Sequence, residues 1–141
     1  MLSGRQVLRR ERGAAAVEFA LVFPMLLVLL FGIIDFGMLV NTNVIVANAS
    51  RDAARTASLG GTEADIRTQA SAGLTSLSSR DSGNVTISVT CTKTAVACTS
   101  YSQTSSGDTA IVSISVVHQW LFPLWPLSSV TIVKTNQMRI E

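Results

Sequence analysis

The feature that most constrains the fold is a long apolar run near the N-terminus. No residue in 19–34 carries a charge, and within 14–40 only Glu18 and Asp35 do. As a helix rising about 1.5 Å per residue, residues 14–40 would be about 40 Å long, which exceeds the roughly 30 Å hydrocarbon core of a bilayer. We therefore expect residues 14–40 to form a helix that is able to span a membrane at a tilt.

The charges in front of this run are strongly biased. Residues 1–13 contain four arginines and one glutamate, whereas the rest of the chain has one more acidic than basic side chain, so the net charge of +2 arises from the N-terminal segment. Arginines before a span predict a cytoplasmic N-terminus and an exported remainder. Only 14 % of the residues are charged, against roughly 25 % in soluble domains. This composition argues against an ordinary soluble enzyme and against a nucleic-acid binder.

A basic segment followed by an apolar run has three interpretations. The first is a secretory signal, because Ala47-Asn48-Ala49 fits the small-x-small pattern of a signal-peptidase site and would release a domain beginning at Ser50. The second is an uncleaved, single-span envelope protein whose exported domain binds a partner. The third is a leader cut after Gly13, which would give Ala14 a free α-amine one helical turn from Glu18. Such a pair of charges would neutralise each other inside an apolar environment, where a lone carboxylate is costly.

The residues around Gly13 carry a family resemblance. The string RGAAAVEFALVFP at 12–24 resembles the N-terminus of TadE-like pseudopilins, the minor pilins of Tad (Flp) type IV pili. The segments FGIIDFG at 31–37 and ASRDAAR at 49–55 fit the same family.

This resemblance implies a structural subunit, not an enzyme, that takes part in assembling a pilus for adhesion or surface attachment. It implies that a prepilin peptidase removes the leader, residues 1–13, by cutting between Gly13 and Ala14, and that Glu18 is the acid read during processing and assembly. The implied partners are that peptidase, other major and minor pilins and the inner-membrane assembly platform. The implied location is the inner membrane, with a place in the extracellular pilus after assembly, and no cofactor or nucleic acid is implied.

The helix is expected to continue beyond the span to residue 59, because Gly60-Gly61 is a typical helix end. Ala49, Ala53 and Ala57 recur at steps of four and predict a small-residue stripe that lets another helix approach closely.

Three charged residues of the long helix are candidate assembly contacts. Arg51 and Arg55 also recur at a step of four, and they form either a solvated face or contacts with an acid of a neighbouring subunit. Asp35 is either a residue of the outer membrane interface or a contact for a basic residue of a neighbouring subunit.

Residues 60–141 predict a small exported α+β domain of pilin-like type. Thr62 is expected to cap a helix over 63–78, since Asp65 follows in the first turn, and residues 79–83 are expected to form a loop. Three segments alternate between apolar and polar residues and predict a small antiparallel sheet that packs on the long helix. They lie at about 85–91, 110–117 and 129–138.

Cys91 and Cys98 are the only cysteines, and they fall in the segment expected to face an oxidising compartment. A disulfide is favoured there. No metal site is expected, because two cysteines and the single histidine cannot supply the four ligands of a typical zinc site. No Ser-His-Asp spacing or G-x-S-x-G elbow indicates catalysis.

Two further segments stand out in the exported domain. Residues 99–108 are rich in Ser, Thr and Gln and predict an exposed tip. Residues 118–126 combine aromatic residues with proline and predict a turn between strands. That turn is either a hydrophobic lid over the core or a surface that rests on a membrane or on another pilin.

Overall fold

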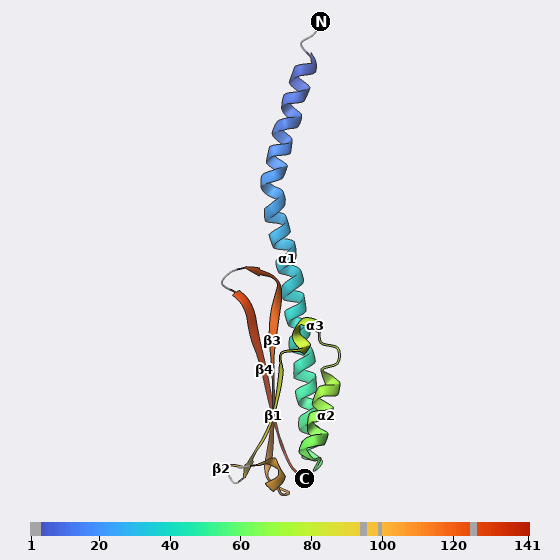
Figure 1. The fold of residues 1–141 in the computed structure, drawn as a ribbon, viewed down its shortest axis with the longest axis vertical. Coiled ribbons are helices and arrows are strands. Elements are labelled where there is room, and N and C mark those ends of the chain that lie inside the picture. The colour runs from blue at the N-terminus through green and yellow to red at the C-terminus, as the bar shows by residue number, and fades with distance from the viewer. Residues whose placement is uncertain (1–3, 94–95, 99, 125–126) are drawn as a thin grey trace. The chain divides into compact units, whose positions relative to one another are not determined.

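The computed structural model describes the backbone of residues 4–93, 96–98, 100–124 and 127–141. The chain is α+β, as predicted: a long N-terminal helix is followed by short helices and an antiparallel sheet (Figure 1). It divides between Gly37 and Met38 into two compact units, here called the N-terminal unit and the C-terminal unit.

The long helix is α1, Gly4–Ser58, which continues through Pro24. In the N-terminal unit its apolar side chains are exposed, among them Phe23 at 41 % and Leu26 at 57 %. Among the described residues α1 is the one helix that is long and apolar enough to cross a membrane by length and composition, and the most apolar window in Gly13–Ser58 is wholly unburied.

The end of α1 is set by local signals, as the sequence predicts. The helix ends at Ser58, and Gly60 follows with a φ of 77°, a conformation that glycine adopts without a steric penalty. The Thr62 hydroxyl then accepts a hydrogen bond from the Asp65 backbone N–H, while the Asp65 carboxylate accepts one from the Thr62 N–H. This capping box begins α2, Glu63–Gly73.

The prediction that this helix reaches residue 78 is wrong. The chain leaves the helix at Leu74, and a turn hydrogen bond from the Leu77 N–H to the Leu74 carbonyl lets both leucines enter the core. A short helix, α3, Ser79–Ser82, occupies the segment predicted to be a loop.

The sheet has four strands in the order β2-β1-β3-β4, all paired antiparallel. Their bounds are β1 Val85–Lys93, β2 Val96–Ala97, β3 Thr109–Leu124 and β4 Leu127–Arg139. The two-residue strand β2 was not predicted. It pairs with the end of β1, where the Cys98 N–H donates to the Cys91 carbonyl at 2.9 Å and a disulfide joins the two side chains.

The prediction of a turn over 118–126 is wrong for its first part. β3 continues to Leu124, because pairing with β4 extends to Gln119↔Ser129 and resumes, after a register shift, at Leu124↔Leu127. Residues 125–126 of the predicted turn lie outside the described residues. Leu121 and Phe122 are 39 % and 43 % exposed, which favours the interpretation of this segment as a contact surface over that of a hydrophobic lid.

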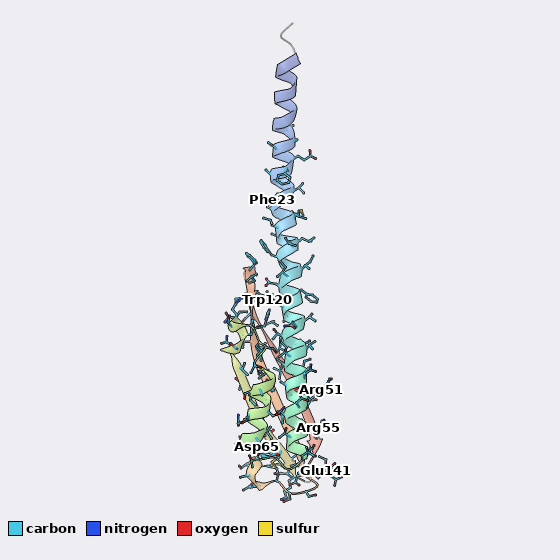
Figure 2. The ribbon with its side chains drawn as sticks, turned by 90° about the vertical axis from the view of Figure 1, so that its right-hand side faces the viewer. Phe23, Arg51, Arg55, Asp65, Trp120 and Glu141 are labelled. Atoms are coloured by element: carbon cyan, nitrogen blue, oxygen red, sulfur yellow. A yellow bond between two sulfur atoms is a disulfide. The ribbon has the colours of Figure 1, made fainter. Side chains whose placement is uncertain are left out.

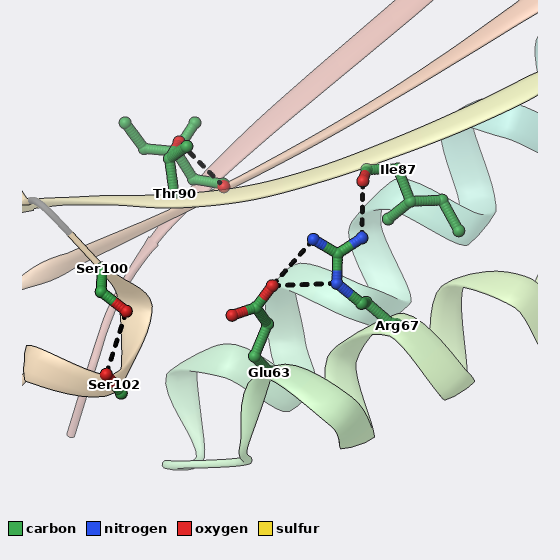
Figure 3. Close-up of polar contacts among 7 residues, drawn as sticks. Glu63, Arg67, Ile87, Thr90, Ser100 and Ser102 are labelled. Carbon is green, nitrogen blue, oxygen red and sulfur yellow. Dashed lines mark hydrogen bonds and ion pairs between the residues drawn. The ribbon is translucent and has the colours of Figure 1, made fainter.

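The core of the C-terminal unit lies between the last turns of α1, helix α2 and the inner face of the sheet. Its members include small residues of α1, two residues of α2 and alternating residues of β3, among them Ala49, Ala53, Ala57, Ile66, Ala70, Val112, Ile114 and Val116. Arg67 links α2 to β1, since its guanidinium donates to the Ile87 carbonyl at 2.7 Å and pairs with Glu63 (Figure 3).

Residues 99–108 were predicted to form an exposed tip; residue 99 lies outside the described residues, and 100–108 are only partly exposed. Tyr101, in the short 3-10 helix η1, Tyr101–Gln103, is 6 % exposed, and its hydroxyl lies 3.4 Å from the Ala57 carbonyl and 3.3 Å from that of Gly61. Burial raises the pKa of the Tyr101 phenol. The aromatic ring therefore draws this segment against the end of α1, a contact that its polar composition does not reveal.

Candidate assembly and membrane-facing residues

The residues predicted to guide processing lie together on the first part of α1. Gly13, Ala14 and Glu18 are all exposed. Ala14 and Glu18 are four residues apart in a continuous helix, so they lie one above the other on the same face. An α-amine on Ala14 would therefore be close to the Glu18 carboxylate.

No contact among the described residues requires a glycine at position 13. A Cβ built on Gly13 meets nothing within 4 Å, and the same holds for Gly32 farther along the helix. Glycine within a helix costs about 0.5–1 kcal/mol relative to alanine. The packing of the described chain therefore does not require a glycine at either position.

The charged candidates on α1 differ in exposure. Arg51 and Arg55 are exposed, and within the described ranges neither forms an ion pair (Figure 2). Asp35 is 4 % exposed and thus already buried within the single chain. The two arginines are therefore the more accessible of the three residues to a neighbouring subunit.

The alanine stripe contacts an element of the same chain. Ala49, Ala53 and Ala57 are at most 1 % exposed. A Cβ built on Gly73 of α2 would lie 2.8 Å from the Ala49 Cβ, so α2 crosses α1 at very close range. The stripe allows the close helix approach that its spacing predicts, and it does so inside the C-terminal unit.

A buried polar cluster was missed from the sequence. The Asp81 carboxylate in α3 is 1 % exposed and accepts hydrogen bonds from the Thr42 hydroxyl at 3.0 Å and from the backbone N–H of Gln119 at 3.2 Å. Its Oδ2 also lies 2.8 Å from Nδ1 of His118. The partners are separated from Asp81 by 37 to 39 residues along the chain, so no local pattern connects them.

The protonation state of this cluster follows from its contacts. Burial alone would raise the pKa of Asp81, but the hydrogen bonds from His118, from the Gln119 N–H and from Thr42, together with the charge of His118, hold this pKa below its usual value. Asp81 is thus an ionised acceptor, and Nδ1 of His118 carries the proton between them. Nε2 of His118 is buried with no hydrogen-bond partner among the described residues, and its ring lies edge-on to Trp120 at 5.5 Å.

The contacts of this cluster connect three elements of the C-terminal unit. Thr42 donates to the carboxylate and not to the imidazole, so the arrangement does not activate a nucleophile. Among the described residues no group of three or more His, Cys, Asp or Glu side chains could hold a metal ion. The arrangement fixes α1, α3 and β3 to one another through a single carboxylate.

Comparison with known proteins finds a similarity to one family over part of the chain. Neither a curated protein nor a solved structure matches the chain significantly. A family model described as "TadE-like protein" matches residues 13–55, which begin at Gly13 and end at Arg55 within α1. The matched segment contains Glu18, Asp35 and Arg51, and over this segment the chain is similar to the TadE-like family.

Proposed function

We propose that the protein is a minor pilin, or pseudopilin, that takes part in assembling a Tad (Flp) pilus for adhesion or surface attachment. The observation that carries this proposal is α1 itself. It matches the TadE-like family over residues 13–55, its first part exposes apolar side chains, and its last turns belong to a separate compact unit. Such a helix can be stored in a membrane and later pack against other helices.

The role is structural, and we propose no enzymatic activity. The proposed partners are a prepilin peptidase, other major and minor pilins and the assembly platform of the inner membrane. The arginine-rich segment before the span favours a cytoplasmic N-terminus, with the C-terminal unit on the outer side of the inner membrane. After assembly the protein would be part of the extracellular pilus.

Processing is proposed at the bond between Gly13 and Ala14. The exposed position of this bond and the unfilled space around Gly13 support recognition by a narrow peptidase cleft. The new α-amine of Ala14 would then lie on the same helix face as Glu18 and neutralise its carboxylate, within one subunit or between neighbours.

The secreted-domain alternative is disfavoured by the fold. A cut after Ala49 would divide α1 at two residues that are at most 1 % exposed, Ala49 and Ser50. It would also separate the domain from Val46, a fully buried core residue, and from Thr42, which donates to Asp81. The uncleaved-anchor alternative predicts an intact N-terminus.

Mass spectrometry of the mature chain from its native membrane tests these alternatives. We expect the chain to begin at Ala14, whereas an N-terminus at Met1 would support the anchor and one at Ser50 the secreted domain. A second measurement uses Glu18→Gln. For a pilin, this variant should insert into the membrane normally and fail to support pilus assembly, whereas normal piliation would contradict the role proposed for the acid.

A further inference from the structure

The two edges of the sheet in the C-terminal unit differ in how they are covered. The strand order is β2-β1-β3-β4, so β1 with the short β2 forms one edge and β4 forms the other (Figure 1). We propose that the β4 edge receives an extended segment of a different pilus subunit as an added strand, and that this segment places a carboxylate opposite Lys134. The inference rests on the proposed function, because it takes the chain to be a pilus subunit.

The backbone groups that β4 offers to a partner follow from its hydrogen bonds to β3. The Ile140 N–H donates to the Asp108 carbonyl at 2.8 Å, and the Gly107 N–H donates to the Ile140 carbonyl at 2.8 Å. Successive residues of an antiparallel strand alternate between bonding to one neighbour and pointing away from it, so the even-numbered residues of β4 bond to β3. The odd-numbered residues direct their N–H and C=O groups away from the sheet: Ser129, Thr131, Val133, Thr135 and Gln137.

The edge formed by β1 is occupied by groups of the same chain. The Arg67 guanidinium donates to the Ile87 carbonyl at 2.7 Å (Figure 3). Farther along, the Cys98 N–H donates to the Cys91 carbonyl at 2.9 Å, and β2 pairs with the last residues of β1. These contacts leave little of the β1 edge for another strand.

The β4 edge has no such cover. Within the part of the chain that the structure describes, β4 pairs with β3 alone, and no side chain bonds to the outward backbone groups of 129–137. The register runs without a bulge from Gln119↔Ser129 to Thr109↔Arg139, and residues 127–133 contain neither proline nor a charge. Bulges, prolines and charges are the devices that protect sheet edges from pairing with other chains. An edge without them from Ser129 to Val133 is suited to receive a strand.

The charges of β4 indicate the chemistry of the added segment. Lys134 and Arg139 are the only charged residues of β4, both are positive, and neither forms an ion pair within the described ranges. Lys134 is even-numbered, so an added antiparallel strand would face it in a non-hydrogen-bonded pair, where opposite Cβ atoms lie about 5 Å apart. An Asp or Glu at that position would pair with the Lys134 ammonium, next to an uncharged stretch that faces Ser129 to Val133.

A different subunit fits this edge better than a second copy of the chain does. β4 runs in the same direction as the last turns of α1, since Asn136 bonds to Ser50 and Glu141 bonds to Ser58. Antiparallel pairing of two β4 strands would turn these helical turns in opposite directions, whereas subunits inserted into one membrane in the same orientation keep them parallel. Parallel pairing of two facing β4 strands would place Lys134 opposite Lys134, an unfavourable pair of like charges.

Variants of the full chain, produced in a strain that lacks the wild-type protein, test the inference. Thr135→Pro removes an outward N–H and spares the bonds to β3, because proline is tolerated on an edge strand whose N–H faces solvent. Val133→Lys is an independent variant that places a charge on the open edge. Ser88→Lys is its matched control, an exposed residue of β1 on the same face of the sheet, since Ser88 pairs with Ser113 and Ser113 with Thr135.

Electron microscopy counts the pili, while immunoblotting of the membrane fraction and thermal unfolding in micelles check insertion and folding. We expect Thr135→Pro and Val133→Lys to insert and fold and to reduce the pili per cell several-fold, and Ser88→Lys to assemble as the wild type does. Lys134→Glu should also reduce piliation, because it would repel the carboxylate, and Lys134→Arg should restore it.

Wild-type piliation by a folded Thr135→Pro or Val133→Lys variant would overturn the inference and leave the proposed function intact. Wild-type piliation by Lys134→Glu would overturn the carboxylate partner. Oxidative cross-linking of Val133→Cys to a second copy of the chain would assign the edge to self-pairing and would also overturn the inference. Normal piliation of the strain that lacks the protein would instead refute the proposed function.

Discussion

Gly73 of α2 lies against Ala49 of α1 so closely that a Cβ built on Gly73 would come within 2.8 Å of the Ala49 Cβ and 3.0 Å of its Cα. Part of this obstruction is backbone, which cannot rotate away as a long side chain could. We therefore expect Gly73→Ala to force α2 away from α1 and to lower the free energy of unfolding by about 1–3 kcal/mol, the typical cost of overpacking. Chemical denaturation of the full chain in detergent micelles, followed by tryptophan fluorescence, measures this change.

Gly83 provides the matched control. It ends α3 with a φ of −77°, and a Cβ there would meet nothing within 4 Å among the described residues. Gly83→Ala should leave stability unchanged or raise it slightly, because alanine restricts the unfolded chain. Equal stability of the two variants would show that α2 can shift without cost.

The Asp81 cluster predicts a stability that depends on pH. Asp81→Asn keeps the shape of the side chain but removes the charge that accepts from Thr42, His118 and the Gln119 N–H. We expect Asp81→Asn to lower the free energy of unfolding by roughly 2–4 kcal/mol at neutral pH, as for other buried groups that lose a charged partner. Asp52→Asn, on an exposed position of α1, is the control and should change stability little.

The sign of the pH effect follows from the direction of the shift. The pKa of Asp81 is lower in the folded protein than in the unfolded chain, where it is about 3.9. The stabilisation that ionised Asp81 gives the fold is therefore fully present above the unfolded pKa and is lost as the pH falls through the folded pKa. The difference in free energy of unfolding between wild type and Asp81→Asn should therefore become smaller below about pH 4. A difference that stays constant from pH 7 to pH 3 would contradict an ionised, stabilising Asp81.

The parts of the fold that the sequence predicts are those set by residues close together in the chain. Gly60 ends α1 and the pair Thr62 and Asp65 begins α2 because these residues act on the backbone within a few positions of themselves. The alternation in β1 and β3 likewise identifies strands directly. The apolar run indicates a candidate membrane span by its length and composition.

The features missed from the sequence depend on distant partners. Nothing near Asp81 indicates that Thr42 and His118 will meet it, and Tyr101 is buried by α1 although its neighbours are polar. The extension of β3 through Leu124 depends on pairing with β4, which outweighs the turn tendency of Pro123. The candidate processing residues Gly13 and Glu18 could be proposed from the sequence because they lie in one short segment, and their roles stay a prediction.

The cap of α2 predicts a modest and specific effect. Thr62→Ala removes the hydroxyl that accepts from the Asp65 N–H and should lower the free energy of unfolding by about 1 kcal/mol. Thr68→Ala is the matched control, since that hydroxyl donates to the Ala64 carbonyl within the same helix and alanine favours helix. Denaturation curves should separate the two variants, and a larger loss for Thr68→Ala would argue against the capping box as a determinant of α2.

Arg51 and Arg55 predict a separation between folding and assembly. Both are exposed on α1 and form no ion pair within the described part of the chain, so Arg51→Gln with Arg55→Gln should change stability by no more than about 0.5 kcal/mol. If the arginines meet acids of a neighbouring subunit, the double variant should insert into the membrane at the wild-type level and yield few or no pili. Arg67→Gln is the control for loss of a surface arginine, because Arg67 pairs with Glu63 inside the chain and should affect folding more than assembly. Electron microscopy of pili, with immunoblotting of the membrane fraction, measures both quantities, and normal piliation of the double variant would assign the arginines to a solvated face.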